Sequence, residues 1–67
     1  MADRKFTLRQ WRKINDMSRK ELADAIGRDP STIARWETDT SVQPRIDDVH
    51  KIEQVLGINW QDDVLVQ

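Results

Sequence analysis

The 67-residue sequence contains no cysteine and only one histidine, His50. Without cysteine the chain can form neither a disulfide nor a thiolate metal site, and a single histidine does not make a metal-binding cluster. Its only two glycines, Gly27 and Gly57, do not form a glycine-rich loop that could hold phosphate groups. No nucleophile–base pair can be assembled from the remaining residues. We therefore expect a binding protein that is not an enzyme and uses no metal or other cofactor.

Long apolar runs are also missing, since no stretch has the length of a signal peptide or of a membrane span. We therefore expect a cytoplasmic protein that does not bind a membrane. The length predicts one domain over residues 1–67, which buries only about 60% of its unfolded surface. Helix packing must then supply the stability, and the three tryptophans, Trp11, Trp36 and Trp60, are its expected anchors.

The charge is small overall but unevenly distributed. The net charge is −1, which gives no support to nucleic-acid binding. Residues 1–35 nevertheless contain nine basic and five acidic residues, a net charge of +4, and residues 36–67 contain two basic and seven acidic residues, a net charge of −5. A chain polarised in this way can present a basic face to phosphate groups. Ordinary solvated surface is the alternative interpretation.

Residues 17–37 predict two short helices joined by a turn. Ser18 and Glu21 form the Ser-x-x-Glu pattern of a capping box, which starts the first helix, and Gly27 suits the left-handed conformation that ends it. Pro30 costs no hydrogen bond as the first residue of the next helix, and the aspartate before it is a favourable N-cap. This arrangement is typical of a helix-turn-helix, a DNA-reading unit. The core-facing residues expected in it are Leu22, Ala23, Ile26, Ile33 and Trp36.

Three further helices complete a predicted all-α chain. One extends over about residues 7–15. The polar segment 38–43 predicts a loop, after which a longer helix follows Pro44 and ends at Gly57. A short fifth helix is expected near residues 60–65. The apolar stripe of the fourth helix is formed by Ile46, Val49, Ile52, Val55 and Leu56.

Four motifs follow one another without insertions. They are Leu8-Arg9-Gln10-Trp11-Arg12, Met17-Ser18-Arg19-Lys20-Glu21-Leu22-Ala23, the segment 27–37 and the proline-led segment 44–57. In this order they resemble the lambda-repressor/Cro-like helix-turn-helix domains of phage repressors and bacterial regulators, over about residues 7–65. The resemblance implies a compact five-helix bundle. Its helix-turn-helix, at about residues 18–37, would consist of helices two and three, with helix three in the major groove of DNA.

The resemblance also implies which residues contact DNA. Arg19 and Arg45 fall where such domains contact the phosphate backbone, and Arg12 and Glu37 fall on a pair that forms an internal salt bridge. The residues that fall where such domains touch base edges are Pro30, Ser31, Thr32 and Arg35. An arginine at such a position can donate two hydrogen bonds to guanine. The alternative is that these side chains only start the helix or lie solvated on its surface, and the residues alone leave this open.

The chain departs from the family pattern in three places. Arg19 replaces a glutamine that usually contacts a phosphate. Thr38-Asp39-Thr40 replaces a turn that usually contains glycine and a basic residue, and phosphate would repel Asp39. Asp16 replaces a glycine between the first two helices, where aspartate tolerates a left-handed conformation better than most residues, at the cost of some strain. The acidic Asp39 and the missing basic residue weaken the case for a DNA contact by the loop at 38–43.

The C-terminal end is too apolar for a solvated tail. Its apolar residues are Ile58, Trp60, Val64, Leu65 and Val66. Such residues either complete the core or form a dimer interface. The resemblance implies dimers on pseudo-palindromic operators, with the two recognition helices about 34 Å apart. We expect a weak homodimer, formed in solution or only on DNA.

Together these observations predict a sequence-specific regulator of transcription that binds a double-stranded DNA operator, of the Cro/repressor type found in phages and mobile elements. The chain has no room for an effector domain, so no small-molecule ligand is expected. Two other functions remain open. The acidic C-terminal half suits a protein-binding antitoxin or anti-repressor on the same fold. An architectural or recombination-directionality protein would bend DNA without repressing.

Overall fold

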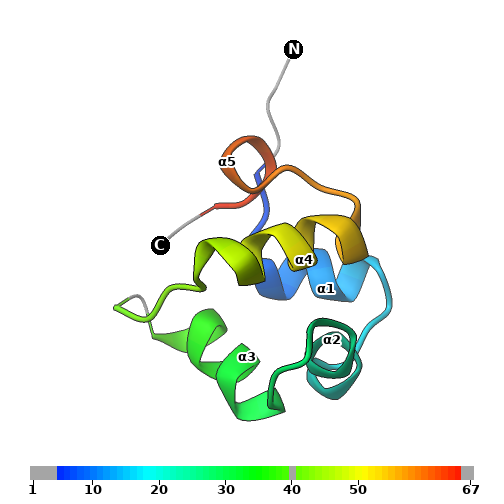
Figure 1. The fold of residues 1–67 in the computed structure, drawn as a ribbon. Helices are drawn as coiled ribbons and strands as arrows, with labels where there is room; N and C mark the ends of the chain where they lie inside the picture. Colours follow the sequence, from blue (N-terminus) through cyan, green and yellow to red (C-terminus); the bar gives the residue numbers. More distant parts are fainter. Residues whose placement is uncertain (1–4, 40, 66–67) are drawn as a thin grey trace.

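The computed structural model describes residues 5–39 and 41–65, and these residues contain five helices (Figure 1). In chain order they are α1 (Leu8–Ile14), α2 (Arg19–Ile26), α3 (Pro30–Thr38), α4 (Ile46–Leu56) and α5 (Trp60–Asp63). No strand lies in the part of the chain that is described, and the expected all-α fold with five helices is confirmed. Over the same residues, none of the helices combines the length and the apolar character needed to cross a membrane.

The helix ends follow from local hydrogen bonding. Ser18 Oγ accepts a hydrogen bond from the backbone N–H of Glu21 at 3.0 Å, and Glu21 Oε1 accepts one from the N–H of Ser18 at 2.9 Å. A capping box of the same kind joins Thr7 and Gln10 at the start of α1. Gly27 ends α2 with a φ of 75°, in the left-handed region expected of it. These caps place the turn between α2 and α3 where the sequence predicts it.

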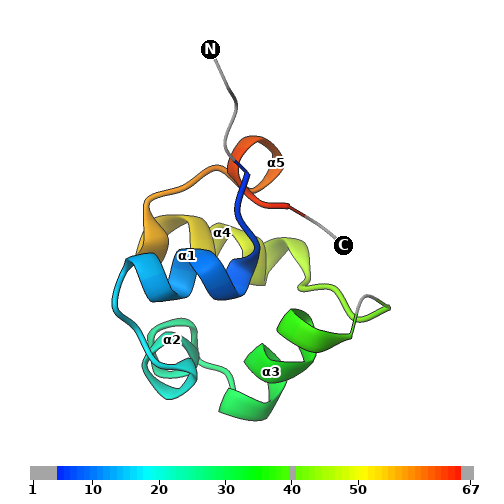
Figure 2. The ribbon, with the colours of Figure 1, turned by 180° about the vertical axis from the view of Figure 1, so that it is seen from behind.

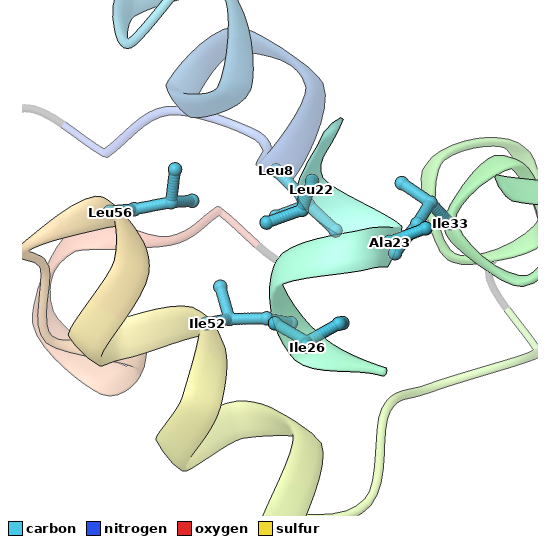
Figure 3. Close-up of a cluster of buried hydrophobic side chains, with 7 residues drawn as sticks. All are labelled: Leu8, Leu22, Ala23, Ile26, Ile33, Ile52 and Leu56. Atoms are coloured by element: carbon cyan, nitrogen blue, oxygen red, sulfur yellow. The ribbon is translucent and has the colours of Figure 1, made fainter. Parts of the chain in front are cut away.

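The core lies where α2 meets its neighbours (Figure 3). Leu22, Ala23 and Ile26 on α2 face Ile33 of α3 and the apolar side of α4, and the side chains of Leu22 and Ile33 are fully buried. Burying a leucine or isoleucine side chain contributes about 1.5–3 kcal/mol. The tryptophans pack against this cluster but are only partly buried. The full set of buried apolar residues in the cluster is Leu8, Leu22, Ala23, Ile26, Ile33, Ile52 and Leu56.

The apolar stripe predicted on α4 is wrong at its first position. Ile46 is 68% exposed, whereas Asp48, which is not part of that stripe, is 2% exposed. At about 100° per residue, a three-residue spacing falls back by about 60° at each step, so Ile46 lies about 120° from Ile52. A four-residue spacing advances by only about 40°, which keeps Asp48, Ile52 and Leu56 on one face. That row faces the core, Val55 of the predicted stripe packs against the core as well, and Ile46 lies outside it.

The two ends of the described chain meet beside α5. Val64 pairs with Phe6 in a single parallel bridge, and the N–H of Leu65 donates to the carbonyl of Phe6 at 2.8 Å. Figure 2 shows these segments side by side. Trp11 Nε1 donates to the carbonyl of Asp63 at 2.7 Å, which fixes the end of α5 on α1. The fifth helix therefore stops at Asp63, two residues earlier than predicted, because the chain turns extended to pair with Phe6.

This bridge also corrects the interpretation of the C-terminal apolar residues. Val64 is 4% exposed, so of the two roles left open for it, it takes the one in the core and offers no side chain to a dimer partner. Leu65 is 48% exposed, and Ile58 and Trp60 are partly buried against the core cluster. Val66, the remaining residue of the set, lies outside the described residues.

Candidate nucleic-acid interface

The helix pair α2 and α3 forms the most extensive helix–helix contact in the protein. Both helices lie at the end of the molecule opposite α5 (Figures 1 and 2). The buried Ile33 fixes the rotation of α3 about its axis, because its side chain must point toward α2. Residues on the opposite side of α3 are therefore turned away from the protein.

Ser31 and Arg35 occupy that outward side of α3. They are four residues apart, and each lies about 160° around the helix from Ile33. Both are exposed. The Arg35 side chain makes no hydrogen bond or salt bridge with any residue in the ranges 5–39 and 41–65. A guanidinium that forms no internal hydrogen bond, on the side of the helix away from the core, is available to an external acceptor, with the Asp39 carboxylate near enough to interact with its charge.

The other two predicted base-contact residues lie closer to the protein. Thr32 is about 100° from Ile33 and is partly buried. Pro30 is the first residue of α3 and is exposed, about 60° from Ile33. Asp29 occupies the N-cap position, as predicted, but its side chain makes no capping hydrogen bond. Of the four predicted base-contact residues, Ser31 and Arg35 are therefore the best placed to contact DNA, and Pro30 and Thr32 lie to either side of them on α3.

Arg12, Arg19 and Glu37 form a three-residue cluster, which we call the Glu37 cluster. Arg12 Nε lies 2.8 Å from Glu37 Oε2, so the expected ion pair is present. Arg12 Nη2 also reaches Oε1 at 3.3 Å, and Arg12 Nη1 donates to the carbonyl of Met17 at 2.8 Å. Arg19 Nε donates to the same Oε1 at 3.1 Å, an interaction that the sequence did not indicate. The Glu37 side chain is completely buried by these contacts.

Arg45 lies on a different element from the other predicted contacts. It is the N-cap residue of α4, directly before the exposed Ile46, and is itself exposed. Its backbone N–H donates to Asp48 Oδ2 at 3.4 Å. The start of α4, and with it the Arg45 backbone, is thereby tied to a buried carboxylate.

That carboxylate belongs to an ion pair that the sequence reasoning missed. Arg28 Nε and Nη2 donate to the two carboxyl oxygens of Asp48 at 2.8 and 3.0 Å. The hydrogen bond from Arg28 lowers the pKa of Asp48 below its ordinary value, and the pKa of Arg28 is raised. This pair joins the turn of the helix-turn-helix to the first turn of α4. The four-residue spacing of Asp48 from Ile52 is the signal that could have revealed it.

Asp39 ends α3 and has a local role. Its Oδ1 accepts hydrogen bonds from the backbone N–H and the hydroxyl of Ser41, at 3.0 and 2.6 Å. These hydrogen bonds lower the pKa of Asp39, and the nearby charge of Arg35 adds to the effect. A carboxylate therefore stands at the end of α3, on the loop where we expected phosphate repulsion.

The apolar residues near the C-terminus border a small hollow between the end of α3 and the chain after α5. Its walls include Trp36, Pro44, Trp60 and Leu65. Among the described residues, no group of three or more histidine, cysteine, aspartate or glutamate side chains is arranged to hold a metal ion. The exposed polar surface of α3 and the arginines near it are thus the best candidate site.

The comparisons with known proteins agree with this geometry. A family model described as helix-turn-helix matches residues 8–62, which include α1 to α4 and most of α5. Neither the curated proteins nor the solved structures gave a significant match to the chain. The family match covers most of the sequence and includes both α2 and α3. The chain therefore belongs to the Cro/lambda-repressor-like helix-turn-helix family of DNA-binding transcription regulators.

Proposed function

We propose that the protein is a sequence-specific repressor of the Cro type, of phage or mobile-element origin, that reads the major groove with α3. One observation carries the proposal: Ser31 and Arg35 share the exposed side of α3 opposite the buried Ile33. Arg35 would donate two hydrogen bonds to a guanine, and Ser31, Thr32 and Pro30 would contact neighbouring bases. A good bidentate contact of this kind contributes about 1–3 kcal/mol of discrimination.

Arg19 and Arg45 are proposed as contacts to the phosphate backbone. Arg19 lies on α2 and Arg45 at the start of α4, so neither belongs to the side of α3 that carries Ser31 and Arg35. Such contacts set the position of a protein on DNA and make its affinity depend on salt, but they carry no sequence information. The proposed role is one of binding, not of catalysis, in the cytoplasm.

Selection from a library of randomised DNA duplexes tests this proposal, with the wild-type protein and Arg35→Ala compared in parallel. The wild-type protein should enrich a defined site, and the variant should lose base preference at one position in each half-site. An unchanged preference in the variant would remove Arg35 from the base-reading residues. No enrichment by the wild-type protein would favour a protein partner or a DNA-bending role instead.

The selected site also tests the proposed dimer. If two copies bind a pseudo-palindrome, the enriched half-sites should lie about 10 base pairs apart, one turn of DNA. Leu65, together with the partly buried Ile58 and Trp60, is the surface we propose for the contact between copies. Sedimentation of the protein with and without the selected duplex would give the stoichiometry. A single half-site bound by one copy would exclude the dimer.

A further inference from the structure

The Glu37 cluster contains one more positive charge than negative charge. Arg12 and Arg19 both donate to Glu37, and its Oε1 accepts from both of them. Two guanidinium groups therefore share one buried carboxylate. The net charge of the cluster is +1, and the position of that excess charge decides what the cluster can bind.

The excess charge lies on Arg19. Arg12 has all three of its donor nitrogens engaged, by Glu37 and by the Met17 carbonyl, and its side chain is only 9% exposed. The Arg19 side chain is 41% exposed and uses only Nε inside the protein. Neither Nη atom of Arg19 has a hydrogen-bond partner among residues 5–39 and 41–65.

The nitrogen atoms of the Arg19 guanidinium therefore have two different roles. The Nε atom faces Glu37, and the two Nη atoms remain available as a fork of donors. A guanidinium fork of this kind matches two oxygens of a phosphate group. An arginine fixed at Nε also loses less side-chain freedom on binding than a freely rotating one.

We propose that Glu37 is a positioning residue, which holds Arg19 so that its Nη atoms present a fixed cationic fork to a DNA phosphate. This inference rests on the proposed function, because it assumes that α3 faces DNA. Glu37 lies in the last turn of α3 and Arg19 is the first residue of α2. The same carboxylate therefore links the base-reading helix to the phosphate contact. Glutamine, the usual residue at position 19 in this family, carries no charge for Glu37 to hold.

A charge-preserving substitution separates positioning from simple attraction. Lysine at position 19 keeps the charge, but its single nitrogen cannot serve Glu37 in place of Nε and also form a two-nitrogen fork. We expect Arg19→Lys to bind a 20-base-pair mixed-sequence duplex about fivefold more weakly than the wild-type protein, measured by fluorescence anisotropy in 25 mM KCl. The matched control is Arg9→Lys, an exposed arginine on α1, whose affinity should stay within about twofold of the wild type.

For a second variant, Glu37→Gln, charge attraction and positioning predict changes of DNA affinity in opposite directions. Glu37→Gln makes the protein more positive, so attraction alone predicts tighter binding to DNA. Loss of positioning predicts binding about fivefold weaker, and Arg19→Gln should add little to that loss. Circular dichroism establishes the temperature at which Glu37→Gln is folded; if it is unfolded at every temperature, Arg19→Lys alone decides.

The outcomes distinguish this inference from the function on which it rests. If the wild-type protein binds and the affinity of Arg19→Lys is within twofold of it, the positioning role is overturned and the proposed function stays intact. Tighter binding by folded Glu37→Gln than by the wild-type protein has the same consequence. Absence of wild-type binding to the duplex in 25 mM KCl contradicts the proposed function and this inference together. Weaker binding by Arg19→Lys, with Arg9→Lys unchanged, supports the positioning role.

Discussion

Two buried carboxylates join the helix-turn-helix to neighbouring helices, and they are balanced differently. Glu37, in the last turn of α3, is shared by Arg12 of α1 and Arg19 of α2. Asp48, in the first turn of α4, forms a salt bridge with a single arginine, Arg28, within residues 5–39 and 41–65. The first cluster leaves an excess positive charge at the surface, whereas the second is neutral.

The position of each carboxylate in its helix accounts for the difference. The N-terminal end of a helix carries a partial positive charge and favours an anion, and the C-terminal end disfavours one. Asp48 is near the favourable end of α4 and accepts a hydrogen bond from the backbone N–H of Arg45, so one arginine balances it. Glu37 is near the unfavourable end of α3, where two arginines surround it. A buried charge at an unfavourable helix end thus requires more counter-charge, and here the additional cation is exposed on the side of α2.

The largest expected effect comes from removing the charge of Glu37. Glu37→Gln leaves the buried Arg12 without a counter-charge, and breaking a buried pair in this way costs about 3–5 kcal/mol. Urea unfolding followed by circular dichroism measures the loss. Arg19→Gln is the matched control, because it keeps the Arg12–Glu37 pair and removes a side chain that is 41% exposed; it should cost less than about 1 kcal/mol. Equal losses in the two variants would contradict the central role of the Arg12 pair.

Asp48→Asn should cost less, about 1–3 kcal/mol, because the partner Arg28 is 44% exposed and water can solvate it after the change. The same urea titrations give this value. If Asp48→Asn lost as much unfolding free energy as Glu37→Gln, the two carboxylates would contribute equally to stability, and the contrast between them would be contradicted.

The stability contributed by Asp48 should depend on pH. Its pKa is lowered in the folded protein, mainly by the hydrogen bond from Arg28. A lowered folded-state pKa contributes stability that is present above the unfolded pKa of about 3.9 and is lost as the pH falls through the folded-state value. The difference in unfolding free energy between wild type and Asp48→Asn should therefore narrow in acid. A difference that stays constant from neutral pH to strong acid would contradict the charged pair.

The two clusters should also differ in their response to salt during DNA binding. Arg19→Gln should lower the slope of log affinity against log salt by about 0.9, the value for one phosphate contact. Arg28→Gln should leave that slope nearly unchanged, because the charge of Arg28 is already balanced by Asp48. Anisotropy titrations between 50 and 200 mM KCl compare the two variants. An equal change of slope in both would mean that Arg28 also meets a phosphate.

The smallest expected effect lies beside the Glu37 cluster, at the turn before α2. Asp16 has a φ of 55°, in the left-handed region that glycine adopts without strain. Asp16→Gly should stabilise the protein by about 0.5–1 kcal/mol without touching the ion pairs. Gly27→Ala is its mirror control, since Gly27 has a φ of 75° and alanine there should destabilise by about 1 kcal/mol. Thermal melts of the two variants should therefore move in opposite directions.

Local features of the fold were predictable from the sequence, and contacts between distant segments were less so. The capping box of Ser18 and Glu21 and the left-handed Gly27 depend on residues close together in the chain. The pairing of Arg12 with Glu37 was expected only from the family resemblance. The Arg28–Asp48 pair and the bridge of Phe6 to Val64 depend on how distant segments pack, and the three-residue apolar spacing on α4 wrongly placed Ile46 on the core side, where Asp48 lies. In the candidate site, the outward face of α3 was predictable, but the link between Arg19 and Glu37 was not.

The central claim is that α3 is the surface that meets DNA. Titrating ¹⁵N-labelled protein with the duplex recovered from selection, and following the amide signals by NMR, tests it most directly. The account predicts that the largest shifts fall on residues 31–35, with further shifts at Arg19 and Arg45. Shifts confined to the acidic residues of α4 and α5, or no shifts at all, would contradict it.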